Sequence, residues 1–67
     1  ANIVADVIIG LIPTAKQALL ENGVFITSGI ISDRIEDVTN ALTQAGFVIE
    51  ETRRRSDWAS ITCRLGD

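Results

Sequence analysis

The stretch that decides the fold is FVIEETRRRSDWASITCRL, residues 47–65. Its second half, Trp58–Leu65, alternates apolar and polar residues, which is typical of a strand with one buried face. Its first half, residues 47–52, begins apolar and becomes polar, as an edge strand does. A polar turn region at 53–57 separates the two strands. Because the strands lie so close in sequence, we expect them to pair as an antiparallel hairpin.

A helix is predicted over residues 4–21, ahead of the first strand. Pro13 lies inside this segment and lacks a backbone donor, so the sequence predicts either a kink or a break with Pro13 opening a second segment. Asn22 and Gly23 end the helix, since glycine tolerates the left-handed conformation found at helix ends. Apolar residues at spacings of three and four place a buried stripe on one side of this helix: Ile8, Leu11, Ile12, Ala15, Ala18 and Leu19.

Between this helix and the hairpin, the sequence predicts a strand and a second helix. Residues 24–28 form a short apolar run, typical of a strand covered on both faces, and Ser28-Gly29 closes it. Ser32 or Asp33 can cap the second helix, and Asp33 with Glu36 fits the capping-box spacing. The second helix is predicted to end at Gly46 and to bury the stripe Ile35, Val38, Leu42 and Ala45.

These elements predict an α/β fold in the order α-β-α-β-β. A strand, helix and strand in succession form a right-handed crossover, so the strands at 24–28 and 47–52 should run parallel. The last strand turns back antiparallel and can insert between them. We therefore expect a three-stranded mixed sheet ordered first, third, second, with both helices on one face. No repeat or linker divides residues 1–67.

Composition restricts the possible functions. The formal charge is −3, which argues against a nucleic-acid binder because such proteins gain affinity by neutralising phosphates. The chain has no histidine, which excludes a His-based triad and the usual zinc clusters. Cys63 is the single cysteine, and its place on the apolar face of a strand predicts a buried, inert thiol. No apolar run approaches the roughly 20 residues that span a bilayer, so we expect a cytoplasmic location and no membrane partner.

Three motifs carry a family resemblance: Asn2-Ile3-Val4-Ala5, Ser28-Gly29-Ile30 and Trp58-Ala59-Ser60-Ile61. A sheet that ends in an inserted antiparallel hairpin strand resembles the class I S-adenosylmethionine-dependent methyltransferases. Within that class the chain resembles the ribosomal protein L11 methyltransferase family, which has Asn-Ile-Leu-Ala, Ser-Gly-Ile and a last strand like Trp-Val-Ala-Leu. The chain departs from the family at Val4 and at its Leu-Leu-Glu-Asn-Gly ending of the first helix.

The resemblance implies that residues 1–67 are the carboxyl-terminal fragment of a Rossmann-like catalytic domain. The parent enzyme would transfer methyl from S-adenosylmethionine to amino groups of ribosomal protein L11. This chain lacks the Gly-rich loop and the ribose-binding acid that would hold the cofactor, so we expect the fragment alone to be inactive and to bind no cofactor. The alternative is a complete, small, non-catalytic α/β interaction module. The opening at a polar Asn2, without a capped leading element, favours the fragment.

Asn2 is the candidate catalytic and substrate-binding residue. The resemblance implies that its amide oxygen accepts a hydrogen bond from the acceptor amine and aims the nitrogen lone pair at the methyl group. Asparagine is also a good helix N-cap, and the two interpretations are partly compatible. Ser28 and Gly29, at the same edge of the sheet, are candidate substrate-binding residues, although a tight turn alone would explain Gly29. No residue is assigned to a cofactor or a metal.

The remaining polar and aromatic features are interpreted as structural. Asp6 suits the positive end of a helix. Residues 53–55, Arg-Arg-Arg, are balanced by neighbouring acidic residues, and Trp58 is expected to pack at the base of the hairpin.

A bare sheet face is a further consequence of the predicted fold. With both helices on one face, either Val24 with Ile26 or Phe25 with Thr27 must point outward. An apolar face beside an unpaired edge strand favours association. We therefore expect the isolated chain to associate with itself through that face or edge.

Overall fold

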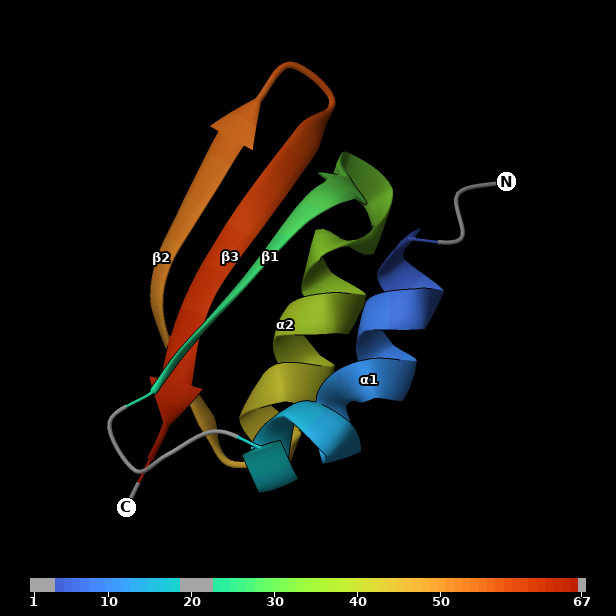
Figure 1. Ribbon diagram of the computed structural model, residues 1–67. Coiled ribbons are helices and arrows are strands. Elements are labelled where there is room, and N and C mark those ends of the chain that lie inside the picture. Colours follow the sequence, from blue (N-terminus) through green and yellow to red (C-terminus); the bar gives the residue numbers. More distant parts are fainter. Residues whose placement is uncertain (1–3, 19–22, 67) are drawn as a thin grey trace.

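The computed structural model describes residues 4–18 and 23–66 (Figure 1). The order α-β-α-β-β is confirmed, with one short 3-10 turn added before the second helix. The elements are α1 (Val4–Ala18), β1 (Val24–Ile31), η1 (Ser32–Arg34), α2 (Ile35–Gln44), β2 (Phe47–Arg55) and β3 (Trp58–Leu65).

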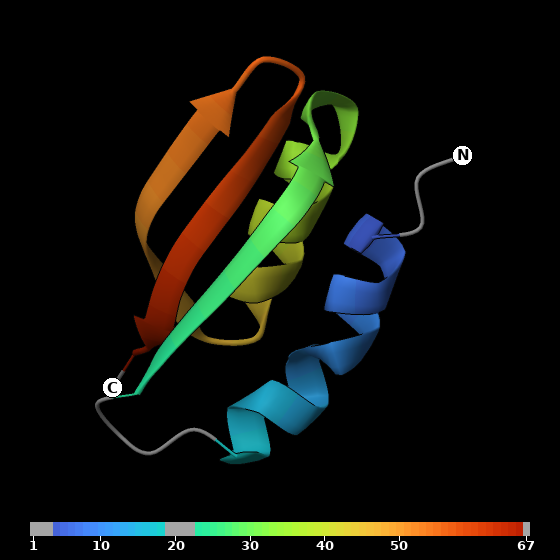
Figure 2. The same ribbon diagram turned by 45° about the horizontal axis from the view of Figure 1, so that its top comes forward.

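The three strands form one sheet in the order β1-β3-β2. β3 pairs antiparallel with β1 and with β2, so β1 and β2 run in the same direction. Both helices lie on one face of this sheet (Figures 1 and 2). The predicted insertion of the last strand between the other two is therefore confirmed.

The hydrophobic core lies between the helices and the covered face of the sheet. The alternation of β3 explains its part of the core, because Ala59, Ile61 and Cys63 are fully buried while Trp58 is exposed. Thr27 is the buried polar residue on β1, and its hydroxyl donates to the carbonyl oxygen of Ile61 at 3.4 Å. The helices contribute Ala5, Ile8, Ile12, Ile35, Val38 and Leu42.

Helix α1 departs from its predicted stripe. It runs without interruption through Pro13, which rules out a second helix beginning there. Leu11 was predicted to be buried but is half exposed, because the side of α1 that meets the sheet is centred on Ala5, Ile8 and Ile12. Ala18 is exposed as well. The predicted helix end at 21–22 lies outside the described residues, and Gly23, which was predicted to terminate the helix, directly precedes β1.

Two strands are longer than predicted, because glycine and arginine are poor indicators of where a strand ends. β1 continues past Ser28-Gly29, where its register with β3 shifts and Gly29 adopts a φ of 78°. This irregularity is a bulge within the strand, rather than its end. β2 continues through the arginines at 53–55, so the turn is only Ser56-Asp57, with Ser56 at a φ of 50°.

The predicted cap of α2 is wrong. Arg34 occupies the N-cap position, and no side chain caps this helix end by a hydrogen bond. Ser32 and Asp33 belong instead to η1, whose tight turn separates β1 from α2. The opposite end agrees with the prediction, because Gly46 adopts a φ of 100°, a conformation that favours glycine.

The uncovered face of the sheet carries Val24 and Ile26, which settles which pair points outward. They are 50% and 66% exposed, whereas Thr27 faces the core. Register places Val24 opposite Arg64 and Ile26 opposite Thr62, on the face that the helices leave bare. We call this surface the open face.

Candidate functional site

The predicted site residues on β1 line a cavity at the carboxyl end of that strand. Its volume is about 440 Å³, and Ser28 and Gly29 form part of its wall. The β2–β3 turn lies beside this end of β1. The backbone N–H of Ser32, the residue after β1, donates to the carbonyl oxygen of Asp57 in that turn at 2.9 Å. The complete lining is Ser28, Gly29, Ile31, Asp57 and Trp58.

The first residue of α1 lies against the same bulge. A Cβ built on Gly29 would stand 3.7 Å from Cγ1 of Val4, an ordinary van der Waals distance. The positive φ of Gly29, rather than a lack of space, is therefore what favours glycine there. Asn2 precedes Val4 by two positions and lies outside the described residues. The structure thus brings Ser28 and Gly29 together with the start of α1, and gives no position for the Asn2 side chain.

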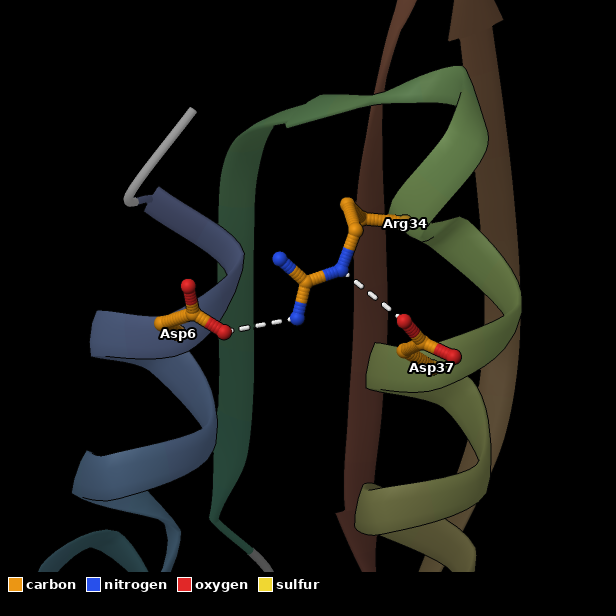
Figure 3. Close-up of polar contacts among 3 residues, drawn as sticks. All are labelled: Asp6, Arg34 and Asp37. Carbon is orange, nitrogen blue, oxygen red and sulfur yellow. Dashed lines mark hydrogen bonds and ion pairs between the residues drawn. The ribbon is translucent and has the colours of Figure 1, made fainter. Parts of the chain in front are cut away.

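Arg34 joins the first turns of the two helices beside this end of the sheet (Figure 3). Its Nη2 lies 2.6 Å from Oδ1 of Asp6, and its Nε lies 2.8 Å from Oδ2 of Asp37. Its side chain is 28% exposed, while the two carboxylates are 64% and 58% exposed. The hydrogen bond and the charge of Arg34 hold the pKa of Asp6 below its ordinary value, and hydrogen bonds to both carboxylates raise the pKa of Arg34.

Three residues at this end were not recognised as site residues from the sequence. Trp58 was expected to pack at the hairpin base, but it is 41% exposed at the hairpin turn and lines the cavity with Asp57. Arg34 was given no role, and Asp6 was explained by the helix dipole alone. The Arg34–Asp6 contact joins residues 28 positions apart. The spacing of residues within one helix or strand cannot predict a contact between segments so far apart in sequence.

Cys63 is the buried thiol that its position on β3 predicts. Its Sγ donates to the carbonyl oxygen of Phe25 at 3.5 Å, and burial raises the pKa of the thiol. A raised pKa leaves the thiol protonated at neutral pH, which is typical of an unreactive cysteine. Within residues 4–18 and 23–66, no cluster of His, Cys, Asp and Glu is arranged to hold a metal ion.

The described residues do not fit a site for the nucleoside part of S-adenosylmethionine. Such a site needs a Gly-rich turn between a strand and a helix, where the backbone approaches the cofactor closely. In the described part of the chain, β1 leads to α2 through Ser32–Arg34, which contains no glycine. We therefore assign no residue of this chain to the cofactor.

None of the described helices has the length and apolar character to cross a membrane.

The fold and the cavity together define the class of protein. A sheet whose last strand inserts antiparallel between two parallel strands, with a cavity at a strand's carboxyl end, resembles the last part of an α/β methyltransferase sheet. The family model for ribosomal protein L11 methyltransferase (PrmA) matches residues 1–65, and the chain belongs to that family.

Relatives of known name support this assignment. The chain is 50% identical, over 96% of its length, to a ribosomal protein L11 methyltransferase from Heliobacterium modesticaldum, and 52% identical, over 98%, to one from an Exiguobacterium species. It covers 20% and 21% of those two proteins, about a fifth of their length. The crystal structure of a ribosomal protein L11 methylase from Lactobacillus delbrueckii subsp. bulgaricus superposes with a TM-score of 0.85 at 27% identity, covering 91% of this chain and 32% of that one.

Proposed function

We propose that this chain is the carboxyl-terminal part of a catalytic domain that transfers methyl from S-adenosylmethionine to amino groups of ribosomal protein L11. Membership of the family and the coverage of about a fifth of its relatives support this proposal. The observation that carries it is the cavity at the carboxyl end of β1. Ligands of open α/β sheets bind at this edge, and Ser28 and Gly29 lie there beside the start of α1.

In the proposed mechanism, this chain orients the acceptor amine. S-adenosylmethionine, when bound, would supply an electrophilic methyl group to the neutral amine nitrogen. As the N–C bond formed, the S–C bond would break, the thioether S-adenosylhomocysteine would leave, and the nitrogen would lose a proton to water. The amide oxygen of Asn2 accepts an N–H from the amine and directs the nitrogen lone pair. A neutral amide suits this role, because a carboxylate would favour the ammonium form, which has no lone pair. Ser28 and Gly29 line the path of the substrate side chain.

The proposal includes what the isolated chain should lack and where the parent works. The chain alone should neither bind the cofactor nor transfer methyl, since its described residues contain no Gly-rich turn between a strand and a helix. The family resemblance places the ribose-binding acid on an upstream strand. A ribosomal protein as substrate implies a cytoplasmic enzyme. The net charge of −3 supports the absence of a nucleic-acid partner, and we propose no membrane partner.

Self-association of the isolated chain is also part of the proposal. β1 is an edge strand of the described sheet and contains no charged residue and no proline, which are the usual protections of a sheet edge. Exposed apolar side chains lie on the open face of all three strands: Val24 and Ile26 on β1, Trp58 on β3 and Val48 on β2.

The test of the proposed function compares the full-length protein with the 67-residue chain. Each is incubated with ribosomal protein L11 and S-adenosylmethionine, and methylation is followed by mass spectrometry of L11. We expect methylated amino groups with the full-length protein only, and calorimetry should detect no cofactor binding by the chain. An unmodified L11 with the full-length protein would refute the function, and micromolar cofactor binding by the chain would refute our placement of the cofactor site.

A further inference from the structure

The contacts of Arg34 suggest a role beyond an ordinary surface ion pair. Exposed pairs contribute little to stability, because both side chains lose freedom and water screens the charges. Arg34 differs in that its guanidinium meets two carboxylates, one on each helix, through different nitrogens. The planar guanidinium fixes the directions of these bonds, so the two carboxylates are held in a defined relation.

Asp37 orients the guanidinium of Arg34 toward α1. It lies three residues after Arg34, in the first turn of α2, and accepts from Nε at 2.8 Å. This local bond holds the guanidinium so that Nη2 points at α1, as Figure 3 shows. Asp6, in the first turn of α1, then accepts from Nη2 at 2.6 Å. The start of α1 is thereby attached to α2 on one side, while Val4 lies beside Gly29 of β1.

We propose that Arg34 is a positioning residue for methyl transfer. It holds the first turn of α1 against the carboxyl end of β1, the edge at which the proposed function places the acceptor amine. This inference rests on the proposed function. Arg34 touches neither substrate nor cofactor in this role, and acts through Asp6 and the helix that Asp6 belongs to.

The kinetic consequence is specific. Loss of the Arg34–Asp6 contact lets the first turn of α1 shift, which misaligns the acceptor amine while the cofactor site is untouched. Small errors in the alignment of reacting groups lower the rate strongly, by about 100-fold for a displacement near 1 Å. Because the Val4–Gly29 contact remains, we expect a smaller loss, about 3- to 10-fold in kcat, with no change in the affinity for S-adenosylmethionine.

The experiment uses the full-length protein with Arg34→Gln, Asp6→Asn and the double variant. Asp6→Asn should lower kcat, and Arg34→Gln should lower it at least as much because it also removes the contact with Asp37. The double variant should lose no more than Arg34→Gln alone, because the Arg34–Asp6 contact is already broken in that variant. Arg34→Lys should recover part of the rate, since its ammonium can still reach one carboxylate. Arg64→Gln is the matched control. It removes an exposed Arg–Glu pair, to Glu50 at 3.0 Å, on the other side of the sheet, and should leave kcat unchanged.

A second measurement reads the position of α1 without relying on activity. Hydrogen exchange of the backbone amides in the first turn of α1 and at Gly29 should become faster in Arg34→Gln and stay unchanged in Arg64→Gln. Unchanged exchange and full kcat in Arg34→Gln would overturn the proposal, as would losses that add in the double variant. If the protein did not methylate L11 at all, the proposed function would fail, and the exchange measurement would still decide whether Arg34 holds the helix.

Discussion

The two faces of the sheet use the same strands but have opposite surroundings. On the covered face, Ile61 and Cys63 are fully buried, and Phe47 belongs to the same core cluster. On the open face, Ile26 is 66% exposed and Val24 is 50% exposed. The covered face therefore gives the chain its core, and the open face has apolar side chains that nothing in the described chain covers. Apolar residues alone do not make a core, because burial depends on which face the helices reach.

The largest expected effect is a difference in stability between the same substitution on the two faces. Ile61→Ala should lower the free energy of unfolding by about 2–5 kcal/mol, because it opens a cavity at a fully buried position. Ile26→Ala, on the open face, should change it by about 0.5 kcal/mol or less. Urea denaturation of the 67-residue chain measures both. Equal losses of unfolding free energy in Ile61→Ala and Ile26→Ala would show that the open face is covered in solution.

The open face should also control self-association. Sedimentation of the chain at about 0.1–1 mM, where weak contacts become visible, should show dimers or larger species. Ile26→Lys should weaken the association by about 10-fold or more, because it places a charge on the unprotected edge strand. Gln17→Lys adds the same charge on the exposed side of α1 and serves as control. A wild-type chain that is monomeric at the highest concentration would contradict the role of the open face.

A smaller effect of opposite sign is expected at two glycines. Gly29→Ala should destabilise the chain by about 1 kcal/mol, because alanine is strained at a φ of 78°. Gly10→Ala, within α1 and with open space around the added Cβ, should stabilise it by about 0.5–1 kcal/mol. Thermal unfolding of both variants checks the signs. A neutral Gly29→Ala would mean that the bulge of β1 can relax into regular strand.

The smallest effect concerns acid pH. The folded-state pKa of Asp6 is lowered by Arg34, so the contribution of this pair is complete above the unfolded pKa of about 3.9 and disappears as the pH falls through the lower folded value. NMR titration of the Asp6 carboxyl should give a pKa below that of an unfolded Asp, and Arg34→Gln should raise it. If the pKa of Asp6 were the same in Arg34→Gln as in the wild-type chain, the Arg34–Asp6 contact would be absent in solution.

The comparison of the two faces also shows what the sequence can and cannot predict. Local periodicity was sufficient for the order of elements and for β3, whose alternation matches its burial at every second residue from Ala59 to Cys63. It failed at Leu11, because the side of a helix that meets a sheet depends on tertiary contacts. The strand through Arg53–Arg55 was missed for a related reason, since an exposed edge strand with charged side chains resembles a loop.

The candidate site also contains some residues that the sequence could identify and others that it could not. Ser28 and Gly29 could be proposed from a motif, and both line the cavity at the carboxyl end of β1. Their roles in binding substrate stay predictions, as does the role of Asn2. Arg34 and Trp58 reach this region through contacts between distant segments, and no spacing rule within one element reports such contacts.

The most direct test of the account is the turnover of Asn2→Ala in the full-length protein, measured beside its affinity for S-adenosylmethionine. If Asn2 orients the acceptor amine, the rate of L11 methylation should fall by about 10- to 100-fold while cofactor affinity stays the same, because the contact acts mainly in the transition state. Wild-type turnover together with a lower melting temperature would contradict the account and leave Asn2 as a helix cap.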